Sequence, residues 1–176
     1  MIFLETPQLL FRPHEARDEQ DFVNMHTDPE VRRYVGGQAW PLGKALDRFR
    51  TEYLGRPEKT YGLWATVFKE EARYIGCCGL RAPENAEGGA SLAFYIARPY
   101  WRQGLASEAA SAFIAYAFER LELPRISADV EKGNAASERI LQKFGFREVG
   151  REVLPGRGRI ICYYELLKDA WEKNRG

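Results

Sequence analysis

Several features that define common protein classes are scarce or missing in this sequence. Cysteine occurs three times, as the adjacent pair Cys77-Cys78 and as Cys162. This odd count lacks the spacing of a disulfide framework, so we interpret the three as small buried hydrophobic residues of a reducing compartment. No apolar run approaches the roughly 20 residues that cross a bilayer, and the first residues lack the pattern of a signal peptide. We therefore expect a cytoplasmic protein without a membrane partner.

A surplus of charge of one sign is also missing. The 26 Lys and Arg residues nearly balance the 25 Asp and Glu residues, for a formal net charge of +1. Such a chain has no overall field that attracts nucleic acid or anionic lipid. Hydrophobic residues make up 45% of the sequence, more than disordered chains contain. Because no repeat, linker or low-complexity tract divides it, we expect one folded domain over residues 1–176, as a monomer or homodimer.

Metal-binding and nucleotide-binding patterns are absent as well. The two histidines, His14 and His26, have no ligand partners at useful spacing. No metal is therefore predicted, and both are interpreted as surface or satisfied histidines. The sequence has no Gly-x-Gly-x-x-Gly after a predicted strand and no Gly-Lys-Ser/Thr, which excludes a dinucleotide fingerprint and a P-loop.

The sequence does contain an ordered succession of helix and strand patterns. Alternating or continuous apolar runs predict strands at 9–13, 61–68, 73–80, 90–97, 125–130, 146–153 and 160–166. Apolar residues three and four apart predict helices at 15–25, 28–34, 44–54, 105–121 and 135–144. Asp28 is the expected cap of the second helix, with Pro29 at its first position. Helices, then antiparallel strands, then alternating units indicate an α+β fold.

The turn before the longest predicted helix has the composition of an anion site. The first turn of a helix carries free N–H groups and a partial positive charge. Gly104 permits close approach of a diphosphate, small Ala106 leaves room for it, and Arg102 and Gln103 offer donors. The alternative is an ordinary helix start, in which Gly104 only makes the turn and Glu108 complements the helix dipole. Judged on these local residues alone, the alternative is the better interpretation.

A longer stretch around this turn resembles the GNAT acetyltransferases. The run 100–109, Tyr-Trp-Arg-Gln-Gly-Leu-Ala-Ser-Glu-Ala, fits the glycine and final alanine of that family's phosphate signature, Gln/Arg-x-x-Gly-x-Gly/Ala. Trp101 departs at the first position, but the ribosomal-protein-alanine (RimJ/RimL-type) branch favours Trp there. Three further stretches are similar to the same branch, at 6–13, 28–31 and 134–146. Together the four span nearly the whole chain.

The resemblance implies a fold, a ligand and a set of contacts. The fold would be a single-domain GNAT-type fold, a mixed and mostly antiparallel sheet that splays open at the cofactor site and is flanked by helices. The cosubstrate would be acetyl-CoA, with an amine acceptor as the other partner. In that family, a backbone N–H of the strand before the phosphate loop polarises the thioester carbonyl, as in an oxyanion hole. The implied cofactor-binding residues are Phe94, Tyr95, Ile96, Arg102, Gln103, Gly104, Leu105, Ala106, Ser107, Asn134 and Lys143.

The implied reaction is direct attack of a neutral primary amine on the acetyl thioester. In the resembled branch, the serine at Ser137 is placed to hydrogen-bond the cofactor sulfur, so Ser137 is the candidate catalytic residue, as partner of the departing thiolate. The alternative is structural, since Asn134 suits a helix cap and Ser137 a first helical turn. For Asn134 we expect capping. Lys143 either reaches the cofactor phosphates or is simply solvated.

The general base is the weakest point of this interpretation. Many relatives carry glutamate in the cofactor strand where this chain has Ser91. Three glutamates on predicted strands remain as candidates, although outward strand faces carry charge in any case; they are Glu148, Glu152 and Glu165. A chain of water molecules is the other route. Tyr163 and Tyr164 point to opposite faces of the last strand, so one of them can face the cleft.

The acceptor amine is expected to be selected by the N-terminal helices, the segment 36–61 and the hairpin 154–159. A protein N-terminus fits the closest branch, but small-molecule amines fit the family equally well. Ser91 motivates one alternative, a non-catalytic acyl-CoA-binding or sensor domain. A second alternative, an RNA- or ribosome-binding protein, rests on Arg151, Arg157 and Arg159, and the net charge of +1 argues against it.

Overall fold

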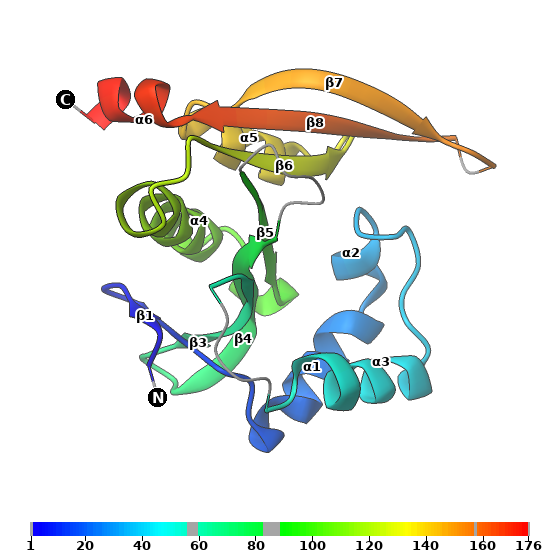
Figure 1. Ribbon diagram of the computed structural model, residues 1–176. Helices are drawn as coiled ribbons and strands as arrows, with labels where there is room; N and C mark the ends of the chain where they lie inside the picture. Colours follow the sequence, from blue (N-terminus) through cyan, green and yellow to red (C-terminus); the bar gives the residue numbers. More distant parts are fainter. Residues whose placement is uncertain (1, 56–59, 83–88, 157, 176) are drawn as a thin grey trace.

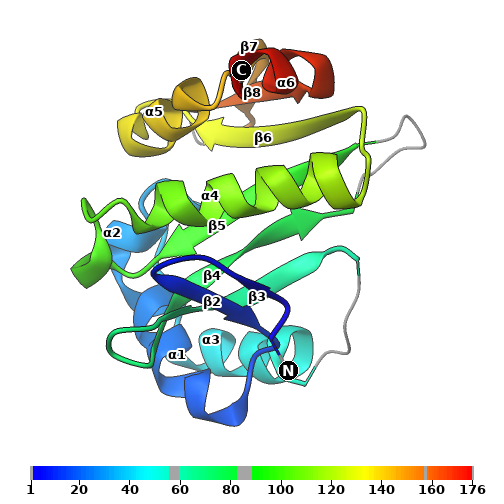
Figure 2. The same ribbon diagram turned by 90° about the vertical axis from the view of Figure 1, so that its left-hand side faces the viewer.

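One sheet organises the molecule. The computed structural model describes residues 2–55, 60–82, 89–156 and 158–175. Eight strands in these ranges form a sheet in the order β1-β2-β3-β4-β5-β6-β8-β7 (Figures 1 and 2). The strands are β1 (Leu4–Glu5), β2 (Leu9–Arg12), β3 (Gly62–Phe68), β4 (Arg73–Arg81), β5 (Ala90–Ile96), β6 (Arg125–Glu131), β7 (Arg147–Leu154) and β8 (Arg159–Leu167).

Six α-helices flank the sheet in the described part of the chain. They are α1 (Glu19–Thr27), α2 (Pro29–Arg32), α3 (Leu42–Arg48), α4 (Leu105–Ala115), α5 (Ala135–Lys143) and α6 (Lys168–Arg175). Short 3-10 turns precede α1 and α4, and π-helical turns continue α3 to Tyr53 and α4 to Arg120. None of the described helices is long and apolar enough to span a bilayer.

The sheet opens between β5 and β6. β5 and β6 run parallel and pair at Ala90 with Ile126 and at Ser91 with Ser127, whereas every other neighbouring pair is antiparallel. Beyond this point β5 continues to Ile96 and β6 to Glu131 without pairing with each other. Figure 1 shows the two strands diverging. The predicted mixed, mostly antiparallel sheet that splays open is confirmed.

The two faces of the sheet are covered differently. Helix α4 crosses one face near the β5–β6 junction (Figure 2) and buries a continuous apolar stripe that includes Leu105, Ala109 and Phe113. This stripe belongs to the main core, which reaches α5 and α6. The other face is covered by α1 and α3, and a smaller cluster around Phe22 and Phe49 fills it. The gap in the sheet therefore lies between an apolar core and a separate aromatic cluster.

The predicted elements at the N-terminus are confirmed with their capping. The Asp28 side chain accepts a hydrogen bond from the Glu30 N–H at 2.9 Å, with Pro29 at the first position of α2. A buried ion pair joins Arg12 at the end of β2 to Asp18 just before α1, through two hydrogen bonds of 2.7 Å. This pair fixes the angle at which α1 leaves the sheet.

Two elements are missing from the sequence-based prediction. Strand β1 has two residues, which is too short to carry a period-two pattern. Helix α6 buries Trp171 against Phe118, with ring centroids 5.1 Å apart, but its other described side chains are half-buried or exposed. A helix with one buried anchor has no apolar stripe to recognise.

The interpretation of the two histidines as surface or satisfied residues is wrong. His14 and His26 are buried among aromatic rings, and His26 stacks on Trp40 at 4.4 Å. Among the described residues, neither ring nitrogen of His26 nor Nε2 of His14 has a hydrogen-bond partner. Burial lowers the pKa of His14 to about 4 and that of His26 to about 3, so both rings stay neutral at physiological pH. The described residues contain no cluster of three or more potential metal ligands.

Candidate active site

The turn between β5 and α4 has the geometry of an anion site. Gly104 is the residue before the first helical position of α4 and adopts a left-handed conformation with φ of 81°. No atom lies within 4 Å of a Cβ placed there, so the space in front of the helix is open. The N–H groups of Leu105, Ala106 and Ser107 belong to the first turn, where a helix provides no internal acceptor. Leu105 buries its side chain, so only its backbone faces this space.

Side chains of the turn hold it onto the end of β5. The indole N–H of Trp101 donates to the Ile96 carbonyl at 2.7 Å, and Gln103 Nε2 donates to the Pro99 carbonyl at 3.0 Å. Arg102 takes a positive φ of 61° and is exposed. Trp101, the residue that departs from the general signature, therefore closes the turn, while Arg102 remains available to a ligand. Part of the donor capacity of Gln103 is used within the turn.

The edge of β5 that faces the gap presents backbone groups. The Ala97 N–H donates to the Ile75 carbonyl of β4 at 2.8 Å. Because hydrogen bonds alternate along an antiparallel ladder, Tyr95 also bonds to β4, while Phe94 and Ile96 direct their backbone groups toward the opposite edge. Pairing with β6 ends before Phe94. The Phe94 N–H and carbonyl therefore line the gap in the sheet.

Three of the four motif stretches, 6–13, 100–109 and 134–146, meet around the start of α4. Glu108 accepts hydrogen bonds from the Thr6 hydroxyl at 2.5 Å and from the backbone N–H of Gln8 at 2.8 Å. Burial alone would raise the pKa of Glu108, but these hydrogen bonds leave it below its ordinary value. Lys143 at the end of α5 donates to the Ser107 hydroxyl at 3.0 Å. A lysine ammonium thus lies beside the first turn of α4, as an anion site requires.

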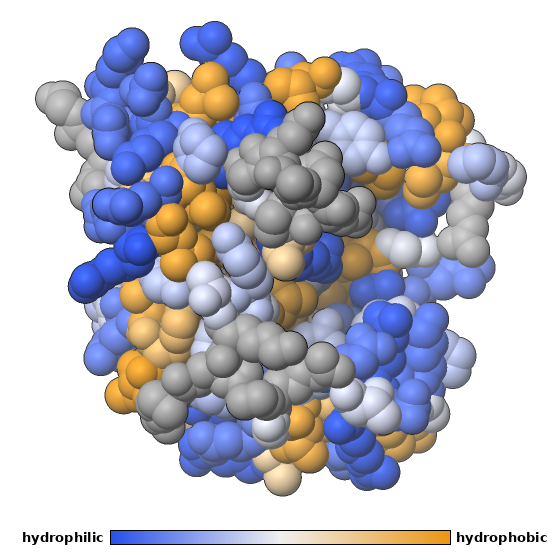
Figure 3. All heavy atoms as spheres, in the orientation of Figure 1, coloured by the Kyte–Doolittle hydropathy of each residue, from blue (hydrophilic) through white to orange (hydrophobic). Residues whose placement is uncertain are grey.

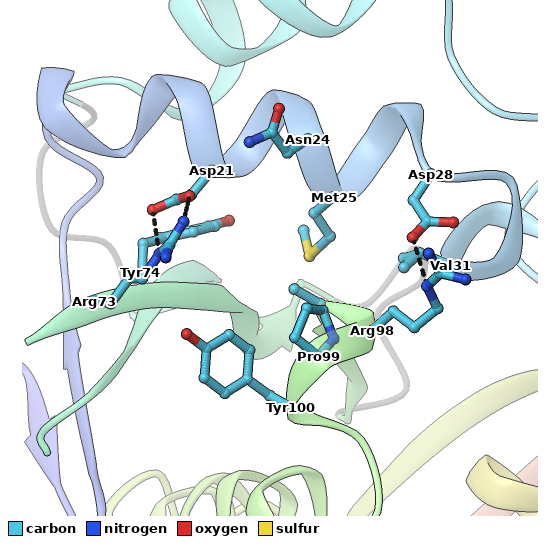
Figure 4. Close-up of a pocket in the computed structure, with 11 residues that line it drawn as sticks. Asp21, Asn24, Met25, Asp28, Val31, Arg73, Tyr74, Arg98, Pro99 and Tyr100 are labelled. Atoms are coloured by element: carbon cyan, nitrogen blue, oxygen red, sulfur yellow. Dashed lines mark hydrogen bonds and ion pairs between the residues drawn. The ribbon is translucent and has the colours of Figure 1, made fainter. Parts of the chain in front are cut away.

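The remaining stretch, 28–31, borders a cavity of about 250 Å³. This cavity is also lined by α1, the start of β4 and the segment after β5 (Figure 4). Its charged lining residues are paired, Arg73 with Asp21 at 2.8 Å and Arg98 with Asp28 at 3.1 Å. Asp28 thereby joins the N-terminus of α2 to the 3-10 turn that follows β5. We assign this cavity a supporting role, because the pairing leaves its charges satisfied.

Asn134 and Ser137 stand together at the start of α5. The Asn134 side chain accepts from the Ser137 N–H at 3.3 Å, which confirms the predicted cap. Ser137 is half-buried. Lys143 lies six residues further along the same helix, a rise of about 9 Å. Ser137 and Lys143 therefore lie at opposite ends of α5, far enough apart to contact different parts of one extended ligand.

The candidate bases named from the sequence are engaged elsewhere. Glu148 pairs with Arg151, Glu152 accepts from the Tyr163 hydroxyl at 2.6 Å, and Glu165 pairs with Arg125 at 3.1 Å. Hydrogen bonding to Arg151 lowers the pKa of Glu148. Ser91 lies opposite Arg81 and Ser127, so the cofactor strand carries a hydroxyl at this position. Of the two adjacent tyrosines, Tyr164 is buried in the main core and Tyr163 is 38% exposed on the opposite face.

The side of β5 that faces α2 brings together groups whose proximity the sequence did not predict, around Tyr95, which the resemblance had implied only as a cofactor contact. The Tyr95 hydroxyl accepts from Arg81 Nη2 at 2.5 Å, and burial raises the pKa of Tyr95. His26 lies 6.3 Å from Tyr95 and stacks on Trp40, over which the Arg32 guanidinium sits at 4.4 Å. Figure 3 shows this face hollowed between β5 and α2. These residues come from four separate segments, so only the fold brings them together.

Comparisons with known proteins give consistent relatives. Residues 8–147 match the family model described as an acetyltransferase (GNAT) domain. The chain is 31% identical to the uncharacterized N-acetyltransferase p20 of Bacillus licheniformis, over 94% of this chain and 96% of p20. It is also 31% identical to the putative ribosomal N-acetyltransferase YdaF of Bacillus subtilis, over 54% of this chain and 56% of YdaF.

Solved structures share the fold. A GNAT-family acetyltransferase from Bacillus anthracis has a TM-score of 0.82 at 22% identity, covering 96% of this chain and 99% of that one. A spermidine N-acetyltransferase from Vibrio cholerae, solved with CoA and spermine, has a TM-score of 0.75 at 18% identity, covering 95% and 99%. At such identities the likeness concerns the arrangement of the chain.

Proposed function

The chain belongs to the GNAT acetyltransferase family and is an acetyl-CoA-dependent N-acetyltransferase, and we propose that it acetylates a primary amine by direct attack. The observation that carries this mechanism is the joint placement of two backbone donor sets. One is the open first turn of α4 behind Gly104, and the other is the unpaired edge of β5 at Phe94. A molecule with a diphosphate at one end and a thioester at the other fits both.

The proposed cofactor contacts follow from these positions. The diphosphate accepts from the N–H groups of the first turn of α4 and from Arg102, with Lys143 adding charge beside Ser107. The pantetheine arm pairs with the free edge of β5. In our proposal the Phe94 N–H polarises the acetyl carbonyl, because a donor aimed at a developing oxyanion stabilises the transition state most.

Acetyl transfer forms a bond between the amine nitrogen and the acetyl carbon and breaks the carbon–sulfur bond. The Ser137 hydroxyl is proposed to hydrogen-bond the departing thiolate and to relay to it a proton taken up from water, so that the serine itself is unchanged. The amine gives up one proton, and with Ser91 in place of a carboxylate this proton leaves through water or through Asp129. Asp129 is exposed on β6 and acts electrostatically on Arg81 and Tyr95, at the mouth of the same cleft.

The acceptor is proposed from one relative whose name states a substrate. Similarity to YdaF favours a ribosomal protein N-terminus, in line with the RimJ/RimL-type motifs. Small amines are the other class within the family. Ser91 and the paired glutamates favour one competing function, a domain that binds acetyl-CoA without turnover.

Calorimetric titration with acetyl-CoA, followed by release of free thiol in the presence of amines and N-terminal peptides, tests the proposal. We expect a single binding site and thiol release that depends on the amine. Binding without release from any amine would establish the non-catalytic alternative. The absence of binding would contradict the assignment of the α4 turn.

A further inference from the structure

Arg32 is a buried cation without an anionic partner in the described chain. It is 8% exposed, and its Nε atom has no hydrogen-bond partner among the described residues. Burial lowers its pKa, and the largest electrostatic influences on it come from Tyr95, Tyr53, Arg48 and Arg159. A buried guanidinium in this state is costly unless something binds to it.

The surrounding chain makes room for this guanidinium. A Cβ on Gly36 would lie 2.8 Å from Arg32 Nη2, and one on Gly37 would lie 3.1 Å from Arg159 Nη1. Both glycines have a positive φ. The turn after α2 therefore packs directly on Arg32 and on the β8 residue Arg159.

A second guanidinium lies beside Tyr95. Arg81, at the end of β4, donates to the Tyr95 hydroxyl. Arg32 is linked to the same tyrosine through Trp40 and His26, which stack on each other. Tyr95 directly follows Phe94, whose backbone lines the gap. Two arginines thus flank the side chain next to the proposed acetyl position.

The other charges near this hollow are matched. Arg48 pairs with Glu52 at 3.0 Å, and Arg159 pairs with Glu131 through two hydrogen bonds. Asp129 is the carboxylate that acts on Arg81. Two arginines against one carboxylate leave the described cleft with a positive excess. A polyamine acceptor would meet repulsion here, whereas an anionic acceptor would satisfy Arg32.

We propose that the acceptor amine carries an anionic group, a carboxylate or a phosphate, and that Arg32 and Arg81 bind this group. Guanidinium groups match both anions with two parallel hydrogen bonds. The inference rests on the proposed acetyltransfer and deepens it, because it names the chemical class of the acceptor.

The experiment compares amines that differ only in the anionic group. Thiol release is measured with phosphoethanolamine against ethanolamine, glutamate against glutamine amide, and Asp-Ala-Ala-amide against Asn-Ala-Ala-amide, with spermidine as a cationic acceptor. We expect kcat/KM to be about 10- to 100-fold higher for the anionic member of at least one pair. The pair with the largest ratio identifies the source of the anion as a phosphate, an amino acid or an acidic peptide.

Variants connect the preference to the two arginines. Arg32→Gln should remove most of the preference while leaving acetyl-CoA affinity unchanged. Arg81→Gln, at an exposed position, provides the same test if loss of the buried cation perturbs folding. Arg33→Gln is the matched control, because this neighbouring arginine is exposed and contacts only Glu30 and the Tyr34 ring among the described residues.

The possible outcomes test the acceptor class and the acetyl transfer separately. A preference for anionic amines that Arg32→Gln or Arg81→Gln abolishes and Arg33→Gln retains supports the inference. Equal rates within every pair, or fastest acetylation of spermidine, overturn the acceptor class and leave the acetyltransferase intact. Absence of thiol release from all amines, despite acetyl-CoA binding, overturns the proposed transfer itself, and the acceptor class fails with it.

Discussion

The two sides of the gap in the sheet are built on different principles. On the side of α4, the proposed cofactor contacts come mostly from one continuous segment and from backbone groups, and the core behind them is apolar. On the side of α1 and α2, the cleft is lined by side chains from separate segments, including Arg32, Trp40, Arg81 and Tyr95. Most buried polar atoms without a partner among the described residues lie on this second side, at His14, His26, Arg32 and Tyr74.

This difference follows from what each side has to bind. A ligand that never changes is well served by backbone N–H groups, because these are fixed by secondary structure and need no particular side chain. A variable acceptor requires side chains that differ from one protein to another. The acceptor side therefore lowers the stability of the fold, because buried polar groups without partners destabilise the folded state. The aromatic cluster should therefore be the less stable half of the molecule.

The largest expected effect is a loss of folding stability at acidic pH, caused by the two buried histidines. In the folded protein the pKa is about 4 for His14 and about 3 for His26, whereas in the unfolded chain both are near 6.5. Between these values the unfolded state binds more protons, so stability falls as the pH falls. From pH 7.5 to pH 4 we expect a loss of about 6 kcal/mol, a large part of the stability of one domain. Urea unfolding at a series of pH values measures it.

Removing the two imidazoles sharpens the same test. The sequence contains no other histidine, so in His14→Phe/His26→Phe the remaining pH dependence belongs to carboxylates and chain ends. We expect the loss of stability between pH 6.5 and pH 4 to shrink to about 1 or 2 kcal/mol. If the double variant unfolded in acid as readily as the parent, the histidine cluster would not be the acid-sensitive element.

On the cofactor side, a single substitution at Gly104 should greatly weaken acetyl-CoA binding. In Gly104→Glu, a carboxylate occupies the open space before α4, and we expect acetyl-CoA affinity to fall by at least about 100-fold through bulk and like charge. Gly156→Glu is the matched control, because Gly156 also has a positive φ and open space around it. Both variants carry a similar backbone strain of about 1 kcal/mol. Calorimetry showing equal affinities in the two would move the diphosphate away from α4.

The same contrast explains what the sequence revealed. The turn before α4 lies in one run, 100–109, where a glycine, an alanine and a helix start are contiguous. Its local residues favoured an ordinary helix start, and the resemblance of the whole run to the family signature pointed to an anion site. The end of α5 is also formed within one segment, because Gly145 takes a positive φ and the Phe146 N–H donates to the Leu141 carbonyl at 3.1 Å. Local signals of this kind depend on backbone geometry.

The acceptor side had no such signal. Arg32 and Arg81 are separated by nearly fifty residues and become neighbours of Tyr95 only through the packing of α2 on the sheet. His14 and His26 lacked ligand spacing, and an isolated histidine in a sequence does not reveal whether aromatic rings from distant segments surround it. Propensity and periodicity describe one segment at a time, whereas this side of the cleft is formed by residues that are distant in the sequence.

The smallest expected effect concerns Ser137, the proposed partner of the departing thiolate on the cofactor side of the gap. Ser137→Ala keeps the Asn134 cap, which bonds to a backbone N–H, and removes only the hydroxyl. We expect kcat to fall about tenfold, or 1.4 kcal/mol, with acetyl-CoA affinity within about twofold of the parent. Ser111→Ala, at an exposed position of α4, should leave both unchanged. Ser137→Thr should restore turnover, because it returns a hydroxyl. Full activity in Ser137→Ala would limit Ser137 to a structural role and assign thiolate protonation to water.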